Sequence, residues 1–588
     1  MGAICGIYSP GESAASVAPV VDRMATALRA RSPVLPPTEN FSKISVDTCG
    51  MSMAVSHDGH WEDTRTLAVV DGEISGATSR TANADLAEFL ATTRKEGNHP
   101  TPFAFPGTGY WACAAFDRTN SRIWLARDPY ANKPLYYYHD PATALVVFAS
   151  EPSAILAHPL VPRRINREGI TAFLRFGYIP ARLSAFDGIH KVFPGVALSF
   201  ADDGTKQEHR FWSMPPIEPV EESLESMLPR VREHVIASVQ RSWAGDDVPG
   251  LLLSGGIDST VVLAALRELG ARNIRTFTFG FDRNGQASTA DLDMSRTVAQ
   301  SFDTQHEEIW IDETHQPEAG VRRWLEETCE PFLTPNIYAK ALLLEKAHRH
   351  GVRRCLTGTG SAYSFERRPD EFLRKLRKRA GKHTTMENWT VTRRANLFSE
   401  EEVEALTGRS CEETHQICLQ ILEAYAEDVR SRPWGNFGDF MFDASVRMQT
   451  GEKAGAVMER VASRCGVDMF HPLYDPDLHA FANTLPSAWK RNKQVLRSAF
   501  QKDLPTKVLE RSNVGFTSPY WVGANALPQV EQAYLTEEAF ARHGIISWPA
   551  AKRFLADADQ RNRARKQTWG LTVLQAWLDA NFSFARKT

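Results

Sequence analysis

One ten-residue run, from Leu251 to Thr260, combines residue types that can hold a phosphate group. Three leucines are followed by Ser254-Gly255-Gly256-Ile257-Asp258-Ser259. A strand that ends in a glycine turn at the start of a helix binds anions, because free backbone N–H groups and the helix dipole point at the anion. Asp258 adds a carboxylate where a magnesium ion would bridge phosphate oxygens. An ordinary buried strand-turn-helix is the alternative, but this pattern is tighter than a lone glycine-rich loop and predicts a phosphate cradle.

The segments around this run predict alternating strands and helices. Residues 251–253 predict a buried strand, and the apolar spacing over residues 257–269 predicts a helix. Residues 275–281 and 353–357 predict two further strands, and the last third of the chain is rich in helical patterns. This alternation predicts a parallel sheet with crossover helices. Ligands of such sheets bind beyond the carboxyl ends of the strands, where the glycine turn would lie.

The first part of the chain has a different pattern, of short β-rich segments between Gly, Pro, Asn and Asp clusters. Leu145–Ser150 and Val196–Phe200 are two of these segments. From Glu222 onward the pattern becomes helical. We therefore predict one domain over residues 1–205 and a second over residues 206–588, since the chain is long enough for two separate cores.

The net charge, the apolar runs and the cysteines argue against several classes of protein. The net charge is −3, so no overall basic field indicates a nucleic-acid partner. No apolar run approaches the ~18 residues that cross a bilayer, and the first residues do not resemble a secretory signal. The eight cysteines are scattered without a Cys-x-x-Cys pair, so neither a zinc site nor a disulfide framework is indicated. We expect a cytoplasmic protein with no nucleic acid and no membrane as partner.

The stretch between Glu366 and His383 is rich in Arg and Lys. A solvated helix face is one interpretation. The alternative is a flexible basic element over the active site, which would meet an acidic or peptide substrate and act as a lid.

The Ser254–Ser259 run resembles the pyrophosphate-binding loop of ATP pyrophosphatases, which split ATP into AMP and pyrophosphate. Among them, the chain resembles the asparagine synthetase family over roughly residues 1 to 530. The matching segments are Cys5–Tyr8, Leu125–Tyr137, Phe148–Glu151, Phe176–Pro180, Ile189–Gly195, Arg210–Trp212, Glu330–Phe332, Pro472–Asp475, Lys493–Arg497 and Arg511–Phe516. The resemblance implies a two-domain protein of α/β and α+β class. Its parts would be an N-terminal Ntn-hydrolase-like β-rich sandwich of glutamine amidotransferase type and a C-terminal parallel-sheet ATP pyrophosphatase domain with a helical C-terminal part.

In this family a carboxylate attacks the α-phosphorus of ATP to form an acyl-adenylate, and an amine then displaces AMP. The resemblance implies ATP and Mg²⁺ as cofactors, with Asp258 as the metal ligand. Lys493 is a candidate catalytic cation, and Tyr363 is a candidate acid or base unless it is simply packed. The implied nucleotide-binding residues are Leu252, Ser254, Gly255, Gly256, Asp258, Ser259, Phe279, Thr357 and Gly358.

Three positions of this half depart from the family pattern. Ala362 stands where the family has an aspartate that is its second magnesium ligand, and Tyr363 replaces the glutamate after it. Asn513 replaces a lysine that stabilises charge on the adenylate and pyrophosphate. Each lost electrostatic contact should cost roughly 100- to 1000-fold in rate. Lys493, Lys490 or an arginine of the basic stretch are the candidate replacements.

The N-terminal half departs from the glutaminase pattern of the family. The family nucleophile is a cysteine at the mature N-terminus whose free amino group acts as base, but Cys5 is internal. Ser52 stands at about the position of the family's glutamine-binding arginine. Asp71 and Gly72 stand where the family has an Asn-Gly pair, whose asparagine side chain donates a hydrogen bond to the oxyanion. An ionised carboxylate only accepts hydrogen bonds, so it would repel that charge. Asp85 is the candidate for the substrate-amine carboxylate. We expect this domain to be an inactive glutaminase kept as a structural partner.

These observations favour an ATP-dependent amide ligase or macrocyclase whose amine comes from the substrate. Family members with this profile include β-lactam synthetases and lasso-peptide cyclases, so we expect a small-molecule or peptide substrate of natural-product biosynthesis and biosynthetic partner proteins. A non-catalytic homologue that binds nucleotide or a partner protein is the first alternative, motivated by Ala362 and Asn513. An asparagine synthetase that uses ammonia or glutamine is the second.

Overall fold

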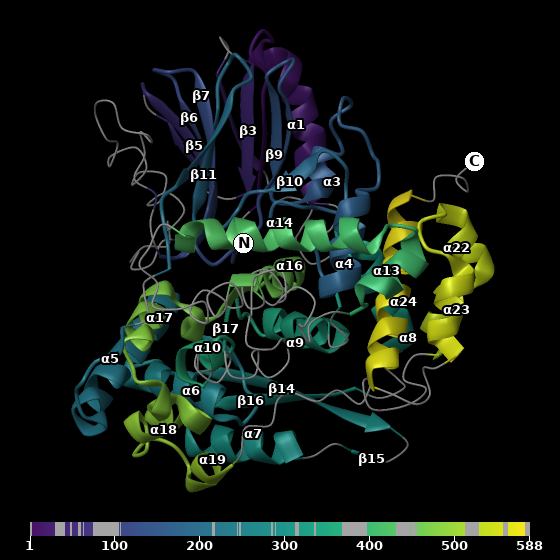
Figure 1. The fold of residues 1–588 in the computed structure, drawn as a ribbon. Helices are drawn as coiled ribbons and strands as arrows, with labels where there is room; N and C mark the ends of the chain where they lie inside the picture. Colours follow the sequence, from purple (N-terminus) through teal and green to yellow (C-terminus); the bar gives the residue numbers. More distant parts are fainter. Residues whose placement is uncertain are drawn as a thin grey trace.

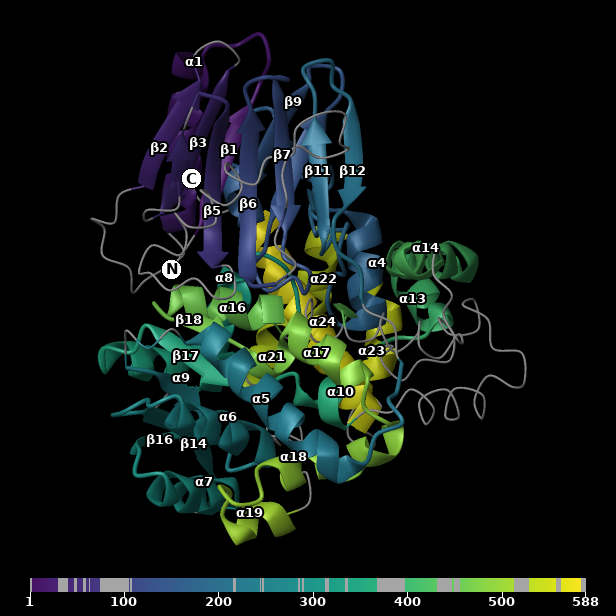
Figure 2. The same ribbon diagram turned by 90° about the vertical axis from the view of Figure 1, so that its left-hand side faces the viewer.

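Two antiparallel sheets pack face to face at one end of the molecule (Figures 1 and 2). The computed structural model describes residues 3–29, 41–46, 50–56, 60–62, 64–73, 105, 108–214, 218–243, 245, 248–283, 286–287, 290–311, 317–333, 337–366, 397–430, 447–448, 455–511, 528–556 and 562–582. The first sheet has the order β10 (Ile189–Lys191), β8 (Tyr136–Asp140), β9 (Leu145–Ala149), β1 (Ile4–Tyr8), β3 (Met51–Ser56) and β2 (Phe41–Val46). The second has the order β12 (Lys206–Arg210), β11 (Val196–Phe200), β7 (Arg122–Arg127), β6 (Tyr110–Asp117), β5 (Thr66–Glu73) and β4 (His60–Glu62).

Strand β1 lies in the middle of the first sheet and has buried side chains on both faces. Ile4 and Tyr8 contact the core between the two sheets, whereas Cys5 and Ile7 contact the core beneath α1 (Ala14–Arg29). This alternation follows from the two-residue period of a strand. The apolar N-terminal run is therefore a central strand with no exposed face.

The second half contains the predicted parallel sheet. Its parallel strands are β16 (Gln305–Ile311), β14 (Arg275–Arg283), β13 (Gly250–Leu252), β17 (Arg354–Thr357) and β18 (Asp468–Phe470), and β15 (Gln286–Ala287) pairs antiparallel with the end of β14. The helices between and before these strands are α5 (Leu224–Ser242), α6 (Ile257–Glu268), α7 (Ala290–Ser301), α8 (Pro317–Glu327), α9 (Ile337–Arg349), α10 (Ser361–Phe365) and α16 (Ala456–Arg464). The predicted two-domain α/β fold with an antiparallel sandwich and a parallel sheet is confirmed.

The predicted strand over the three leucines differs in its bounds. It ends at Leu252, which is only partly buried, although the backbone N–H of Leu253 still donates to the carbonyl oxygen of Phe277 in β14 at 2.8 Å. The helix ends one residue earlier than its pattern predicted, at Glu268, because Leu269 is its C-cap. The following Gly270 has a φ of +87°, a backbone conformation in which glycine has no steric penalty.

Helices of the second half also cover the sandwich (Figure 1). Tyr425 of α14 (Cys411–Arg430) contacts Phe193 at the base of the sandwich, with ring centroids 4.7 Å apart. Trp577 of α24 (Asn562–Phe582) packs edge-on against Phe186, with ring centroids 5.4 Å apart. The two halves therefore share buried cores. The remaining elements are α3 (Pro152–Ile155), α4 (Arg167–Phe176), α13 (Glu400–Thr407), α14 (Cys411–Arg430), η4 (Pro472–Tyr474), α17 (Pro476–Asn483), η5 (Ser487–Lys493), α18 (Gln494–Ala499), α19 (Thr506–Glu510), α21 (Pro528–Tyr534), α22 (Glu537–His543), α23 (Trp548–Ala556) and α24 (Asn562–Phe582).

The predicted domain boundary at residue 205 falls between β11 and β12, which pair along their whole length. Residues 206–210 thus complete a sheet of the sandwich before the chain enters the second half. Within the part of the chain that the structure describes, no helix is both long enough and apolar enough to cross a membrane.

Candidate functional site

The chain leaves β13 and enters α6 through a tight turn made by Ser254, Gly255 and Gly256. Gly255 has a φ of +67°, and a Cβ atom there would lie 2.7 Å from the backbone nitrogen of Ser295 in α7. The turn therefore requires glycine for both its conformation and its packing. Gly256 is the N-cap of α6 and offers no side chain to cap the first turn of the helix. An anion could accept hydrogen bonds from the N–H groups at this end of the helix.

Two serine hydroxyl groups form hydrogen bonds within the turn. The Ser254 and Ser259 oxygens lie 3.2 Å apart, the backbone N–H of Ser254 donates to Ser259 Oγ at 3.3 Å, and that of Gly256 donates to Ser254 Oγ at 3.3 Å. The structure thus brings together the four residues predicted to hold pyrophosphate.

The C-terminal end of β17 lies against the N-terminus of α6. A Cβ atom on Gly358 would lie 2.6 Å from the backbone nitrogen of Ser259 and 2.7 Å from Cβ of Asp258, so only glycine permits this approach. Thr357 is the last residue of β17 and pairs with Leu252 of β13. The predicted neighbours Thr357 and Gly358 therefore lie beside Asp258 at the carboxyl edge of the sheet, where open α/β sheets bind ligands.

Lys493 connects Asp258 to a second carboxylate. Its Nζ donates to Oδ1 and Oδ2 of Asp258 at 2.8 and 2.6 Å and lies 3.4 Å from Oε2 of Glu366. The Lys493 side chain is only 5% exposed. Asn492 and Lys493 both have left-handed backbone conformations, with φ of 52° and 57°. Such conformations are costly for residues other than glycine and are found mainly where the surroundings enforce them, often at functional sites.

A buried histidine contacts the side chain of Thr357. Nδ1 of His471, the residue after β18, is 2.7 Å from Thr357 Oγ1, and its backbone N–H donates to the Tyr110 hydroxyl at 3.0 Å. Among the described residues its Nε2 has no hydrogen-bond partner. Burial lowers the pKa of His471 to about 3, and the positive charge of Lys340 contributes, so the ring is neutral at neutral pH. Sequence reasoning missed His471 and Lys340; a polar residue directly after a buried strand was the available signal for His471.

The remaining predicted residues of this half are less closely grouped. Phe279 is 5% exposed and belongs to a core cluster against which the partly buried Leu252 packs. Burial lowers the pKa of Lys490, a candidate replacement cation, to about 7. Tyr363 is in α10, but its side chain, like Asn513 and residues 367–383, lies outside the described residues. Among those that are described, no group of three or more His, Cys, Asp or Glu side chains could hold a metal ion.

Cys5 has the environment of a core residue. It pairs with Ala54 and Ala149 on either side of β1 and is fully buried. Burial, with a smaller effect of Asp22, raises the pKa of its thiol, which disfavours the thiolate form that acts as a nucleophile. Ser52 is also buried, opposite Ile7 in the next strand. Asp85 lies outside the described residues.

Asp71 is held by neighbours that neutralise its charge. Its Oδ2 accepts a hydrogen bond from Ser150 Oγ at 3.4 Å, and Oδ1 lies 3.5 Å from Lys133 Nζ. Lys133 also forms ion pairs with Glu459 of α16 and Asp468 of β18. Burial alone would lower the pKa of Lys133, but the three carboxylates raise it well above its ordinary value. The lysine side chain is therefore a buried cation shared between the sandwich and the second half.

The two residues after Asp71 complete this contact between the halves. Gly72 has a φ of +110°, and a Cβ atom there would lie 1.8 Å from the carbonyl oxygen of Tyr110, so this position of β5 requires glycine. Glu73 forms two hydrogen bonds with Arg354 at the start of β17, at 2.7 and 2.9 Å. The segment predicted to be a lost oxyanion site is thus part of the interface with the parallel sheet.

Glu330, from the matched Glu-Pro-Phe segment, forms a second buried contact of this kind. It accepts hydrogen bonds from the Tyr136 hydroxyl at 2.9 Å and the Ala185 backbone N–H at 3.0 Å, and it pairs with Lys191 at 2.8 Å. All three partners belong to the first half of the chain. The two halves are therefore joined by charged contacts as well as by shared apolar cores.

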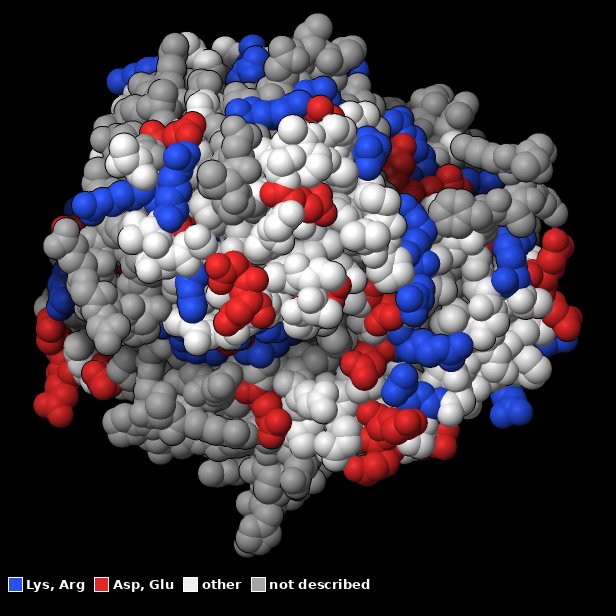
Figure 3. Space-filling view, turned by 90° about the horizontal axis from the view of Figure 1, so that it is seen from above, with Lys and Arg blue, Asp and Glu red and all other residues white. Residues whose placement is uncertain are grey.

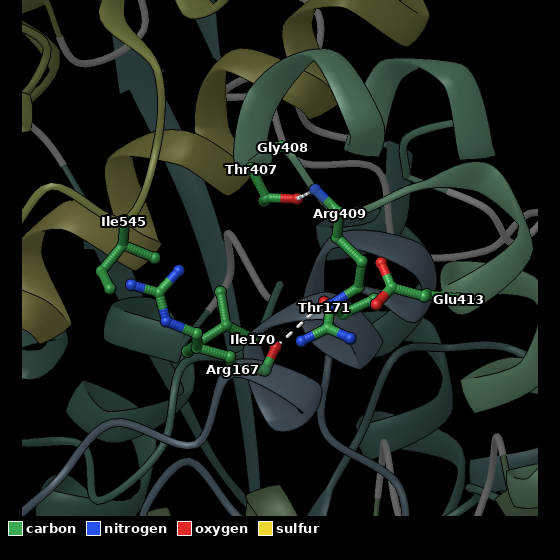
Figure 4. A pocket seen from close by; sticks show the side chains of 8 residues that line it. All are labelled: Arg167, Ile170, Thr171, Thr407, Gly408, Arg409, Glu413 and Ile545. Carbon is green, nitrogen blue, oxygen red and sulfur yellow. Dashed lines mark hydrogen bonds between the residues drawn. The ribbon is translucent and has the colours of Figure 1, made fainter.

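A pocket elsewhere on the surface has no part in this site. It has a volume of about 210 Å³ and lies between α4 and the turn from α13 to α14 (Figure 4). None of its lining residues, which include Arg167 and Arg409, is among those predicted for function. On the face seen from above, Lys and Arg side chains are interspersed with Asp and Glu side chains (Figure 3).

Comparison with known proteins gives two family matches. Residues 230–579, more than half of the chain, match the asparagine synthase family, and residues 80–212 match a glutamine amidotransferase domain. A putative glutamine-hydrolyzing asparagine synthetase of Mycobacterium tuberculosis is 24% identical over 519 residues, which are 80% of this chain and 76% of that protein. A second one, from Methanocaldococcus jannaschii, is 26% identical over 209 residues, or 35% of this chain and 39% of that protein. A solved allosteric regulatory enzyme of purine biosynthesis aligns with a TM-score of 0.24 and 13% identity, covering 53% of this chain and 80% of that one.

Proposed function

Since the chain belongs to the asparagine synthase family, we propose that it is an ATP-dependent amide ligase or macrocyclase that releases AMP and pyrophosphate. In this proposal a substrate carboxylate is activated as an acyl-adenylate, and an amine of the substrate attacks it. The substrate would be a small molecule or a peptide of natural-product biosynthesis, as for a β-lactam synthetase-like or lasso cyclase-like enzyme.

The observation that carries this proposal is the convergence of the glycine turn, Gly358, Asp258 and Lys493 at one edge of the sheet. The N–H groups at the start of α6 would bind the phosphate tail of ATP. The ammonium of Lys493 would neutralise charge that develops on the departing pyrophosphate. The carboxylate of Asp258 suits Mg²⁺, because it already binds a cation, the Lys493 ammonium. When bound, the metal would draw charge from the phosphate oxygens.

The structure of the sandwich bears on the source of the amine. Cys5 is fully buried in a central strand, and Asp71 stands where a hydrogen-bond donor is needed. Both features argue against release of ammonia from glutamine at this site. They support an amine that is part of the substrate, as in ring closure.

The sandwich would then serve the ligase half as a structural partner. Arg354 begins β17, and Thr357, the last residue of that strand, lies beside the glycine turn. Glu73 of the sandwich fixes Arg354, and Lys133 of the sandwich binds Glu459 and Asp468. These contacts support a role of the first half in holding the strands that form the nucleotide edge.

A non-catalytic homologue that binds nucleotide or a partner protein is the second candidate. Ala362, which is partly exposed in α10, cannot ligate a metal, and this observation favours it. An asparagine synthetase that uses ammonia or glutamine is the third, supported by the names of the relatives.

The test is formation of AMP and pyrophosphate from ATP and Mg²⁺ with candidate peptide and amino-acid carboxylates. A ligase forms both products with the right substrate, and Asp258→Ala abolishes them. If wild type and Asp258→Ala are equally inert across the substrates while wild type still binds nucleotide, the non-catalytic candidate is correct. Glutamate formation from glutamine that disappears in Cys5→Ala would show that the amine comes from glutamine instead.

A further inference from the structure

We propose that Glu366 is the second protein ligand of a divalent-cation site that it forms with Asp258 beside the ammonium of Lys493. This inference rests on the proposed function, because the cation would enter with the phosphates of ATP. It assigns the site to a residue outside the motif positions that carry the family resemblance.

The geometry places the two carboxylates around one point. Both oxygens of Asp258 and Oε2 of Glu366 lie within 3.4 Å of the same nitrogen, Lys493 Nζ. The carboxylates belong to different elements, since Asp258 is in the first turn of α6 and Glu366 is the C-cap of α10. A positive charge of about the size of an ammonium group is therefore already accommodated between them.

The local structure of α10 explains how Glu366 reaches this point. Its backbone N–H donates to the carbonyl oxygen of Ala362 at 3.2 Å, one helical turn earlier. Glu366 therefore lies one helical turn after Ala362, at the end of the short helix that follows β17. The helix packs against η5 and α18, which hold Lys493 between them.

A polyphosphate that binds at this point needs an additional cation, because the charges of the surrounding side chains cancel one another. Two carboxylates face Lys493 and the nearby guanidinium of Arg497, whose electrostatic partners are Asp258 and Glu366. The formal charges of these four groups cancel, whereas the phosphate tail of ATP carries several negative charges. Mg²⁺ is typically bound by one or two carboxylates together with substrate phosphates. The two carboxylates beside the glycine turn supply that donor set.

The test measures metal binding rather than turnover. Mn²⁺, which has the same ligand preferences, is titrated in the presence of α,β-methylene-ATP and followed by its electron paramagnetic resonance signal. We expect Glu366→Gln to weaken Mn²⁺ binding by roughly tenfold or more, as even the loss of groups that only orient ligands does. The matched control is Glu233→Gln, an exposed glutamate of α5 outside the site, which should bind Mn²⁺ as wild type does.

A second variant separates ligation from an indirect effect through Lys493. In a Lys493→Met background there is no lysine position left to disturb, and we expect Glu366→Gln to weaken Mn²⁺ binding there as well. Equal binding by Glu366→Gln and wild type would overturn the proposal. So would a loss that disappears in the Lys493→Met background, because the loss would then reflect the position of Lys493. The experiment measures no reaction product, so its result can be interpreted even if no ligase substrate is found.

Discussion

Arg354 and Glu73, which are 281 positions apart in the chain, form a two-fold hydrogen-bonded ion pair between the parallel sheet and the sandwich. Arg354 also donates to the carbonyl oxygen of Ser242 at 3.1 Å and lies 4.4 Å from the ring centroid of Phe470. The arginine thus ties β17 to β5, α5 and β18. Because β17 ends beside the glycine turn, this pair connects the sandwich to the proposed nucleotide edge.

Glu73→Gln should weaken this connection. The amide keeps one acceptor but loses the charge, and the expected loss in the free energy of unfolding is about 1–3 kcal/mol for a partly buried charged hydrogen bond. We also expect slower pyrophosphate release, because the position of β17 is less well fixed. The control is Glu62→Gln, which breaks an ion pair with Arg118 inside the sandwich and should cost less than about 1 kcal/mol. Equal effects of the two variants on urea denaturation and on pyrophosphate release would contradict the role of Glu73.

Gly255→Ala tests the requirement for glycine in the turn. A left-handed alanine costs roughly 1–2 kcal/mol, and the new Cβ atom would also lie 2.7 Å from the Ser295 nitrogen. Gly270→Ala is the control, because Gly270 has a φ of +87° but a Cβ atom there would meet no other atom within 4 Å. We expect Gly255→Ala to be the less stable variant and to bind ATP at least about tenfold more weakly in calorimetry. An ATP affinity equal to that of Gly270→Ala would show that the turn does not bind the nucleotide.

Lys493→Met tests the cation at the glycine turn. The side chain is similar in length but has no charge, so developing charge on pyrophosphate loses its partner. We expect pyrophosphate release to fall about 100- to 1000-fold. Lys502→Met, at an exposed position between α18 and α19, should leave the rate unchanged. A rate for Lys493→Met within a few-fold of wild type would assign this role to another cation, such as Lys490, the nearest lysine in the sequence.

Because two histidines are buried and neutral, we predict that the protein loses stability in mild acid. Burial lowers the pKa of both His471 and His479 to about 3, with Lys340 and Lys490 as the respective positive neighbours. The unfolded chain protonates histidine near pH 6.5, so below this pH it binds more protons than the folded protein does. The free energy of unfolding should therefore fall as the pH falls below 6.5, by roughly 2 kcal/mol per histidine at pH 5.

His479→Gln should remove its share of this effect. The side-chain amide can still bond the Tyr130 hydroxyl, which lies 2.9 Å from His479 Nδ1. Urea denaturation at pH 7 and pH 5 measures the difference, and the loss between these pH values should be smaller for this variant than for wild type. His60→Gln, at an exposed position in β4, is the control. An unchanged difference for His479→Gln would contradict a neutral, buried His479.

The sequence predicted those parts of the site that depend on local patterns. The glycine turn, its flanking strand and helix, and the strands over residues 275–281 and 353–357 follow from apolar spacing and glycine positions over a few residues. The burial of Cys5 is likewise indicated by its neighbours in the sequence. These features need no knowledge of distant contacts.

The contacts that sequence reasoning missed all join distant segments. Lys493 binds Asp258 across 235 positions, and Tyr110 binds His471 across 361. Such partners are chosen by the packing of whole elements, and no local pattern records them. In the sequence Glu366 is only the edge of a basic stretch, because its relation to Asp258 exists only once α10 has packed against η5.

The most direct test of the proposed chemistry follows an oxygen atom. A substrate whose carboxylate carries ¹⁸O is incubated with ATP, Mg²⁺ and the wild-type protein, and the AMP is analysed by mass spectrometry. Acyl-adenylate formation at the Asp258 turn predicts one ¹⁸O atom in the phosphate of AMP, and ring closure by an amine of the same substrate predicts a product lighter than the substrate by one molecule of labelled water. AMP that forms without the label would contradict the proposed chemistry.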